Sequence, residues 1–275
     1  MTAEKPILII GGAGKTGRRV NGLLIEKGHA TRPVSRSTDP AFDWADPATW
    51  DAALAGTRAA YVTYQPDLSV PGAAEAIGLL AEKAKAHGLE HLVLLSGRGE
   101  PGAERAEKVL SMSGLDWNVV RASWFAQNFS EEFMAQAIQA GELALPVGPV
   151  PEPFIDADDI AEVVTAALTE ERLRNRLYEV TGPRALTFAE AIGSISSASG
   201  RPVLFRQIST ADFEAGMRQA GVPDDMIGLL NELFTEVLDG RNARVAHGVE
   251  EALGRPPRDF SSYAAKAAEA GAWES

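Results

Sequence analysis

Residues 7–20 read Ile-Leu-Ile-Ile-Gly-Gly-Ala-Gly-Lys-Thr-Gly-Arg-Arg-Val, and this stretch decides the fold. Its four consecutive aliphatic residues predict a buried parallel strand. Three spaced glycines follow, and then Val20, Leu23 and Leu24 recur at helical spacing until Gly28 ends the helix. The predicted order is therefore a strand, a glycine turn and a helix.

The glycine turn fits two spacings of a dinucleotide-binding pattern, one through Gly12, Gly14 and Gly17 and one that starts at Gly11 instead. Without Cβ atoms the turn can be tight, its backbone can approach a pyrophosphate, and the helix can lie close to the strand. The helix N-terminus adds free N–H groups and a partial positive charge. The turn therefore predicts dinucleotide binding, and the alternative is a glycine turn that binds nothing.

Gly14-Lys15-Thr16 also resembles the end of an ATP-binding P-loop. That motif requires a further glycine at position 9, where this chain has Ile9. We therefore do not expect ATP hydrolysis.

The composition narrows the class of protein. The chain has 275 residues, a net charge of −12 and no cysteine. The negative charge argues against nucleic acids and anionic membranes as partners, because both require a basic face on the protein. Without cysteine the chain has no disulfide, thiolate metal site or cysteine nucleophile. No segment approaches the length of a membrane span, and residues 1–6 do not resemble a signal peptide. We expect a cytoplasmic, metal-free protein that has no nucleic-acid or membrane partner and is a monomer or homodimer.

The four histidines show no metal-ligand spacing. His87 and His91 are four residues apart, but Gly88 ends a helix between them. We expect both histidines on the surface or in loops.

Strand and helix patterns alternate at short spacing through the first part of the chain. This alternation predicts an α/β fold of the Rossmann type, with a doubly wound parallel sheet and helices on both faces. We predict a dinucleotide-binding domain over residues 1–150 and a smaller, mostly helical substrate or lid subdomain over residues 151–275. The expected strands cover residues 7–10, 30–36, 42–44, 58–63, 91–95, 117–120, 177–181 and 203–208, and the expected helices include residues 48–54, 70–87, 103–113, 156–168 and one that begins with a capping box at residue 187.

The second strand ends in Ser35 and Arg36, where an NAD-preferring domain would place an acidic residue. A hydroxyl and a guanidinium suit the 2′-phosphate of NADPH, so we predict NADPH over NADH. The alternative for Arg36 is an ordinary solvated arginine.

Three further stretches are candidates by position. Asp43 and Trp44 lie where the chain could line an adenine pocket, although Trp44 could equally belong to the core. Tyr64 and Gln65 follow a strand at its carboxyl end, where ligands bind in open α/β sheets. Residues 124–129 combine three aromatic rings and two amides, which suits either a flat ligand or core packing.

The helical remainder carries an apolar stripe, which we interpret as core or pocket wall, with a dimer seam as the less favoured reading. The stripe consists of Ile227, Leu230, Leu233, Phe234, Val237 and Leu238.

Acid–base motifs of common enzymes are missing from the sequence. No tyrosine has a lysine four residues later, and no Gly-x-Ser-x-Gly elbow is present. Tyr263 has Lys266 three residues on, but we expect it on the surface of the C-terminal helix. We expect Glu104, Glu107 and Lys108 on the solvated face of their helix. Since ketone reduction needs a proton donor and iminium reduction does not, the chain is not expected to be a simple carbonyl reductase.

Taken together, these stretches resemble the NmrA-like, atypical short-chain dehydrogenases/reductases over nearly the whole chain. The likeness is strongest to bacterial relatives of the ergot-alkaloid reductases (festuclavine and agroclavine synthase-like proteins), which reduce an iminium with NADPH and lack the tyrosine–lysine pair. Neighbouring branches include quinone and azo-dye reductases and NADP(H)-sensing regulators. The resemblance is carried by residues 11–17, 35–36, 42–50, 94–99, 113–117, 124–129, 154–160, 181–183 and 254–257.

The resemblance implies phosphate contacts from residues 11–17, 2′-phosphate contacts from Arg36 and adenine contacts near Asp43 and Trp44. It also implies nicotinamide-side contacts from Tyr64, Ser96 and residues 124–128, and it places Ala103 or a neighbour where the family usually has a lysine. The predicted cofactor-binding residues are Gly11, Gly14, Lys15, Thr16, Gly17, Ser35, Arg36, Asp43, Trp44, Tyr64, Gln65, Ser96, Trp124 and Phe125. The candidates on the substrate or nicotinamide side are Tyr64, Trp124 and Asn128.

Two hypotheses follow for the function. The first is an NADPH-dependent reductase of an imine or iminium, a quinone or a conjugated double bond in a small molecule. The second is a non-catalytic NADP(H)-binding sensor that reports redox state to a partner protein. A sugar-nucleotide epimerase has less support, because it too would need the missing tyrosine and lysine.

Overall fold

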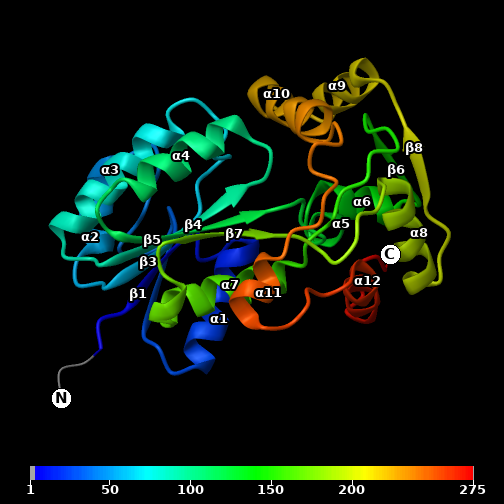
Figure 1. Cartoon of the computed structure of the whole chain (residues 1–275). Helices are drawn as coiled ribbons and strands as arrows, with labels where there is room; N and C mark the ends of the chain where they lie inside the picture. The colour runs from blue at the N-terminus through cyan, green and yellow to red at the C-terminus, as the bar shows by residue number, and fades with distance from the viewer. Residues whose placement is uncertain (1–3, 275) are drawn as a thin grey trace. The chain divides into compact units, whose positions relative to one another are not determined.

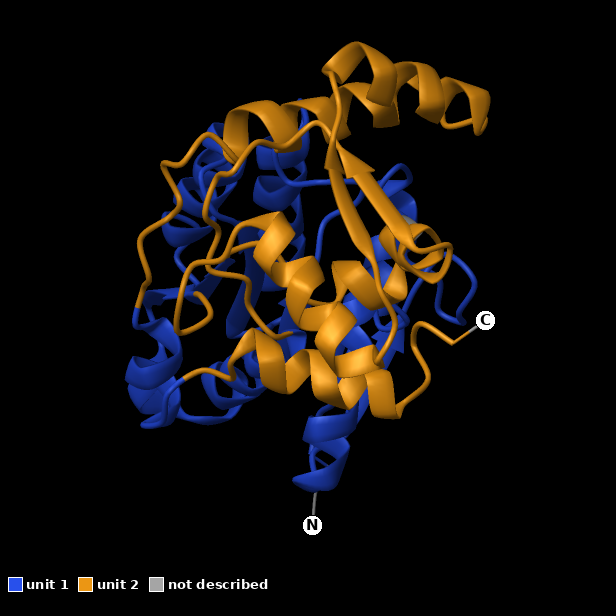
Figure 2. Cartoon of the chain, turned by 90° about the vertical axis from the view of Figure 1, so that its right-hand side faces the viewer, with its two compact units in different colours: residues 1–122, 157–180, 247–256 blue, residues 123–156, 181–246, 257–275 orange. Residues whose placement is uncertain are grey.

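The computed structural model describes residues 4–274, which divide into two compact units (Figure 2). Unit 1 comprises residues 1–122, 157–180 and 247–256, and unit 2 comprises residues 123–156, 181–246 and 257–275. Each unit is thus built from separate stretches of sequence. Residue 150, where the sequence predicts the domain boundary, lies inside a segment of unit 2.

Unit 1 contains a six-stranded parallel sheet in the order β2-β1-β3-β4-β5-β7. Pyrophosphates bind at the carboxyl end of β1 in sheets of this kind, because the strand order reverses beside that strand. The predicted α/β fold of the Rossmann type is confirmed. The strands are β1 (Ile7–Ile10), β2 (Thr31–Val34), β3 (Ala59–Val62), β4 (His91–Gly97), β5 (Asp116–Ala122) and β7 (Arg176–Val180).

Helices cover both faces of this sheet, as the fold requires (Figure 1). One layer packs α1 and α7 together with α11, and the other packs α3 against α2 and α4. The two strands β1 and β3 consist of apolar residues throughout and are fully buried between these layers. The elements of these layers are α1 (Lys15–Glu26), α7 (Ala157–Thr169), α11 (Gly248–Leu253), α2 (Trp50–Leu54), α3 (Ala73–Ala86) and α4 (Pro101–Ser111), with short 3₁₀ turns at Pro47–Thr49 and Glu171–Leu173.

Unit 2 has a small parallel sheet of β6 (Glu142–Leu145) and β8 (Leu204–Gln207), together with helices. Its core is a cluster of aromatic rings in which Phe129, Phe154 and Phe188 pack edge to face or tilted, with centroids 5.1–5.5 Å apart. The predicted capping box at Thr187 begins α8. The helices are α5 (Asn128–Glu131), α6 (Phe133–Gln139), α8 (Phe188–Ser199), α9 (Thr210–Gln219), α10 (Asp224–Glu232), a π-helix at Leu233–Val237 and α12 (Phe260–Glu269).

Residues 42–44 do not form the predicted strand. Phe42 donates its N–H to the Ser35 carbonyl, and the chain then turns through an isolated bridge between Asp43 and Asp46. The Asp43 carboxylate closes the turn by accepting the N–H of Ala45. Local side-chain bonds thus replace a strand ladder here.

Two further expectations about surface exposure are wrong. His91 is 1% exposed inside β4, and Tyr263 is 4% exposed in the core of unit 2. Both predictions relied on local pattern, whereas burial depends on which elements pack over the residue. The apolar stripe of residues 227–238 contributes Ile227, Phe234 and Val237 to buried positions, in agreement with the core interpretation.

Within residues 4–274 no helix is long and apolar enough to cross a membrane.

Candidate functional site

The glycine turn after β1 leaves no room for side chains. Gly11 has a φ of +77°, and a Cβ built on it would lie 2.2 Å from Thr63 Oγ1, which itself donates to the Ile10 carbonyl. A Cβ on Gly17 would lie 2.1 Å from the Gly11 carbonyl oxygen. The turn is therefore held tightly between β1, β3 and the first turn of α1, and it forms the close backbone surface that a pyrophosphate requires.

The N-terminus of α1 points at this turn. Gly14 is its N-cap residue, no side chain caps it, and its first turn holds no acidic residue. The first N–H groups of a helix have no acceptor within the helix, so they are available to an anion. Thr16 is fixed there by Tyr61 of β3, whose hydroxyl donates to Thr16 Oγ1 over 2.8 Å. Burial raises the pKa of Tyr61, which keeps that donor protonated.

The exit of β2 presents hydroxyl groups and one cation. Arg36 is exposed, and Ser35 Oγ lies 3.1 Å from Ser37 Oγ. Thr38 Oγ1 accepts the Ser35 N–H, and its single proton lies within hydrogen-bond reach of the carbonyls of Ser35 and Pro40. This loop is therefore ordered by its own hydrogen bonds while the Arg36 guanidinium extends into solvent.

An aromatic cluster lies between this loop and the end of β3. The Trp44 ring is 5.1 Å from Phe42, 5.3 Å from Trp50 and 4.7 Å from Tyr64, measured between centroids. Both indoles are fixed by hydrogen bonds, because Trp44 Nε1 donates to the Thr63 carbonyl over 3.0 Å and Trp50 Nε1 donates to the Asp43 carbonyl over 2.6 Å. The predicted residues Asp43, Trp44 and Tyr64 are thus brought together, and the neighbouring Gln65 is exposed.

Tyr64 is half-buried in this cluster. Burial, followed by the nearby Glu75 carboxylate, raises the pKa of its hydroxyl. At neutral pH Tyr64 is therefore a neutral phenol, which can donate a hydrogen bond but is a weak acid.

Ser96 lies at the carboxyl end of β4, in register with Arg121 of β5. Its hydroxyl donates to Glu107 Oε1 over 2.6 Å, and Arg121 Nε donates to the same oxygen over 2.8 Å. Arg121 also bonds Glu107 Oε2, and this carboxylate raises the pKa of the guanidinium. Ser96 is 4% exposed and Glu107 is 6% exposed, so this is a buried, charged hydrogen-bond network.

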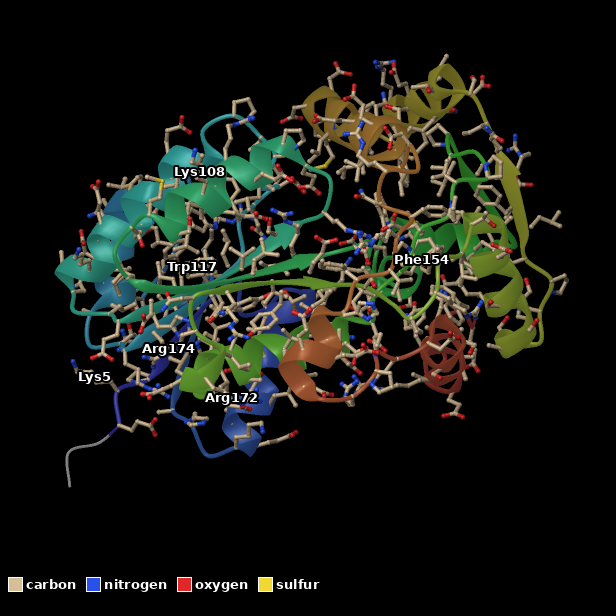
Figure 3. The ribbon with its side chains drawn as sticks, in the orientation of Figure 1. Lys5, Lys108, Trp117, Phe154, Arg172 and Arg174 are labelled. Atoms are coloured by element: carbon tan, nitrogen blue, oxygen red, sulfur yellow. The ribbon has the colours of Figure 1, made fainter. Side chains whose placement is uncertain are left out.

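Glu107 is the functional candidate that sequence reasoning missed. The expectation that it lies on the solvated face of its helix is wrong, while Glu104 and Lys108 are exposed as expected (Lys108 is labelled on α4 in Figure 3). The signal was present in the spacing, because Glu107 is four residues after buried Ala103 and three before buried Leu110. It therefore lies on the buried face of α4.

The network continues to β7. Arg98, which is 9% exposed, donates from Nε to Glu179 Oε1 over 2.7 Å, and Arg121 Nη1 lies 3.9 Å from Glu179 Oε2. The carboxyl ends of β4, β5 and β7 are thus cross-linked by charged side chains.

The remaining candidates, Trp124, Phe125 and Asn128, belong to unit 2. Trp124 is half-buried and its ring packs against Phe188 and Phe234, at centroid distances of 6.0 and 5.3 Å. Its buried Nε1 has no hydrogen-bond acceptor among residues 4–274. Phe125 is half-buried and forms an isolated backbone bridge with Ile155, and Asn128 begins α5.

The tyrosines other than Tyr64 lie in buried surroundings. Tyr61 is bonded to Thr16, Tyr178 donates to the Leu173 carbonyl, and Tyr263 is buried in an aromatic core. Among residues 4–274 no group of three or more histidine, cysteine, aspartate or glutamate side chains could hold a metal ion. The groups that the described residues bring to the sheet edge include the N-terminus of α1, several hydroxyl groups and a buried ion pair.

Comparison with known proteins agrees with this geometry. Residues 11–171, more than half of the chain, match the NAD(P)H-binding family. The chain is also 32% identical to the NAD(P)H azoreductase of Xenophilus azovorans, in an alignment of 281 positions with gaps that covers 94% of this chain and 96% of the azoreductase. The chain belongs to the NAD(P)H-binding, NmrA-like family of atypical short-chain dehydrogenases/reductases.

Other known proteins are similar to this chain over comparable lengths. The chain is 30% identical to Prestalk A differentiation protein A of Dictyostelium discoideum, covering 96% of this chain and 92% of that protein. It is 28% identical to the agroclavine dehydrogenase of Claviceps fusiformis, covering 94% and 95%. The predicted likeness to the ergot-alkaloid enzymes and the prediction of an NAD(P)H-dependent oxidoreductase are confirmed.

Solved structures share the fold. The triphenylmethane reductase of Citrobacter sp., crystallised in complex with NADP(H), superposes with a TM-score of 0.80 at 16% identity and covers 96% of this chain and 99% of its own. At this identity the likeness supports the fold and carries no statement about substrate.

Proposed function

We propose that this family member is an NADPH-dependent reductase that delivers hydride to an imine or iminium, a quinone or a conjugated double bond of a small molecule. The observation that carries the proposal is the glycine cradle, in which Cβ atoms on Gly11 and Gly17 would overlap Thr63 and the Gly11 carbonyl. A turn this closely packed beside the N-terminus of α1 suits a pyrophosphate.

The loop after β2 supports NADPH over NADH. Arg36 supplies an exposed guanidinium, and the hydroxyls of Ser35, Ser37 and Thr38 order the loop around it. A guanidinium binds a phosphate monoester with charge-assisted, bidentate hydrogen bonds, whereas the 2′-hydroxyl of NADH would offer it no negative charge. We propose that Arg36 holds the 2′-phosphate.

The same reasoning distributes the rest of the cofactor along the sheet edge. Thr16 and the first-turn amides would hold the pyrophosphate, and the cluster of Asp43, Trp44 and Tyr64 would hold the adenine. Bound NADPH supplies a hydride, and what the chain must then provide is the position of the acceptor rather than a strong acid.

The class of acceptor follows from which side chains could donate a proton to the reduced product. The chain has no Tyr-x-x-x-Lys pair, and burial raises the pKa of Tyr64, which makes that hydroxyl a poorer acid. Iminium carbons accept hydride without a proton, and quinones or conjugated alkenes can be protonated afterwards by water. The relatives named as azoreductase and agroclavine dehydrogenase support this class.

The test begins with binding. NADPH and NADH are titrated against the wild type, Arg36→Ala and the control Arg105→Ala, which removes one charge from the exposed face of α4. We expect tighter NADPH binding by the wild type and Arg105→Ala, and a loss of about 10- to 100-fold for NADPH alone in Arg36→Ala, as for a hydrogen bond to a charged group. Equal affinities for both nucleotides in the wild type would contradict the NADPH preference.

NADPH oxidation is then followed with cyclic imines, quinones and azo dyes. Turnover of any of these classes supports the reductase. NADPH binding without turnover of any acceptor would favour the second hypothesis, a non-catalytic NADP(H) sensor. Failure of both nucleotides to bind would reject the proposal altogether.

A further inference from the structure

The Ser96–Glu107–Arg121 network lies where the nicotinamide half of a bound cofactor is expected. In the strand order β2-β1-β3-β4-β5-β7, a dinucleotide centred on β1 places its adenosine half toward β2 and its nicotinamide half toward β3 and β4. Ser96 is the penultimate residue of β4, at the carboxyl end of that strand. Its hydroxyl is therefore the side-chain oxygen of β4 nearest to the expected position of the nicotinamide.

The orientation of the Ser96 hydroxyl is set by Glu107. A serine hydroxyl has one proton to donate and two lone pairs that accept. Glu107 faces the Arg121 guanidinium through both of its oxygens, so it is a carboxylate and can only accept. The single Ser96 proton is committed to Glu107 Oε1, at a distance of 2.6 Å.

Arg121 keeps this arrangement rigid. The guanidinium and the hydroxyl share Glu107 Oε1, and Glu179 adds a second carboxylate 3.9 Å from Arg121 Nη1. Burial of Ser96 and Glu107 strengthens these interactions and excludes competing water. Turning the hydroxyl proton away from Glu107 would break a short, charge-assisted hydrogen bond to a buried carboxylate.

We infer that Glu107 acts as a positioning residue that makes Ser96 an obligate hydrogen-bond acceptor, and that Ser96 accepts the N–H of the nicotinamide carboxamide. A serine held in this way has no proton for a substrate oxygen, so it cannot stabilise the alkoxide formed in ketone reduction. The inference rests on the NADPH binding proposed above, and it explains why the acceptors proposed there need no proton from this position.

The inference is tested with oxidised nucleotides, so that no turnover is involved. NADP⁺ carries the carboxamide NH₂, its 3-acetylpyridine analogue replaces that NH₂ with a methyl group but keeps the carbonyl, and adenosine 2′,5′-bisphosphate lacks the nicotinamide half. The three probes are titrated against the full-length wild type, Ser96→Ala and the control Thr57→Val. Thr57 is also fully buried and donates to a carbonyl, but it precedes β3 at the opposite end of the sheet.

We expect Ser96→Ala to weaken NADP⁺ binding by about 3- to 10-fold, as for loss of one neutral hydrogen bond. Binding of the acetylpyridine analogue and of the bisphosphate should be unchanged, because neither offers an N–H to Ser96. Thr57→Val should bind all three probes as the wild type does.

The Glu107→Gln variant tests whether Glu107 is what makes Ser96 an acceptor rather than a donor. A glutamine amide can donate to Ser96 and release its proton toward the cofactor, so the wild-type preference for NADP⁺ over the acetylpyridine analogue should disappear. Should this variant fail to fold without its ion pair, the Ser96→Ala titrations decide the question alone.

The possible failures are distinguishable. If the wild type binds no NADP⁺ and no NADPH, the proposed function and this inference are both rejected. If NADP⁺ binds and Ser96→Ala leaves its affinity unchanged, the network is only structural and the inference alone is rejected. If Ser96→Ala weakens the acetylpyridine analogue as much as NADP⁺, Ser96 donates to the shared carbonyl, which overturns the acceptor role.

Discussion

The two units each contain an aromatic cluster with a half-buried tryptophan, and the two clusters are held in different ways. In unit 1 the indole N–H of Trp44 donates to the Thr63 carbonyl, and that of Trp50 donates to the Asp43 carbonyl. In unit 2 the rings around Trp124 make only ring contacts to its indole, and its buried N–H has no acceptor among the described residues.

The two clusters therefore differ in how precisely they fix the orientation of their tryptophan. Hydrogen bonds are directional, so the Trp44 indole is fixed in position and angle, whereas ring packing restricts volume more than orientation. Trp124 therefore has fewer constraints on its orientation. Under the function proposed above, the fixed surface around Trp44 would suit the adenosine group, which is the same in every NADPH molecule.

The largest effect on binding and stability is expected at the glycine turn between β1 and α1. Gly17→Ala would place a Cβ 2.1 Å from the Gly11 carbonyl oxygen, so α1 must shift away from the turn. We expect loss of measurable NADPH binding and about 3 kcal/mol less free energy of unfolding, as for overpacking of a tight site. Calorimetric titration and urea unfolding measure these quantities.

Gly22→Ala in the same helix is the matched control. A Cβ there meets nothing within 4 Å, and alanine favours a helix over glycine by about 0.5–1 kcal/mol. This variant should be slightly more stable and bind NADPH normally. If both variants behave alike, the turn is not the rigid scaffold described above.

Lowering the pH tests how the burial of His91 affects the free energy of unfolding. His91 donates from Nε2 to Asn118 Oδ1 over 2.9 Å, because Asn118 Nδ2 is used on the Leu173 and Arg176 carbonyls. Burial lowers the pKa of His91 to about 4, and the nearby Arg174 and Arg58 contribute in the same direction. In the unfolded chain the pKa is near the usual 6.5, so below that pH the unfolded state binds more protons.

The free energy of unfolding should therefore fall as the pH drops from 6.5 toward 4, with about 2 kcal/mol lost between pH 7.5 and pH 5 from His91 alone. In His91→Gln, which can still donate to Asn118, this component should be absent. Urea unfolding of both proteins at several pH values measures the two slopes. Parallel slopes would mean that His91 is not buried as a neutral group.

The smallest effect is the difference in free energy of unfolding between matched substitutions of the two tryptophans. Trp44→Phe and Trp124→Phe remove the same atoms, but only the first breaks a hydrogen bond. We expect Trp44→Phe to lose about 1 kcal/mol more free energy of unfolding than Trp124→Phe. Equal losses would show that the indole bond of Trp44 contributes nothing and would remove the contrast between the clusters.

Much of the fold was predictable because its signals are local. The aliphatic run of β1, the glycine turn and the helix end at Gly28 lie within 22 residues, and each depends on backbone geometry that glycine or β-favouring residues impose. The Thr187 capping box was equally readable, because both partners lie within one helical turn. The turn at residues 42–44 was misread as a strand, because its Asp43 bond to Ala45 competes with extended structure and leaves no periodic signal.

The sequence by itself determined the βαβ order, the glycine cradle and the hydroxyl–arginine loop after β2, since each arises from residues close together in the chain. Only the tertiary structure decided that Glu107, His91 and Tyr263 are buried. Whether a charged or polar residue is buried depends on what lies opposite, and the Ser96 and Arg121 partners of Glu107 are 11 and 14 residues away on two different strands. A buried carboxylate requires such partners, and a chain written out in one dimension does not reveal which strands bring them together.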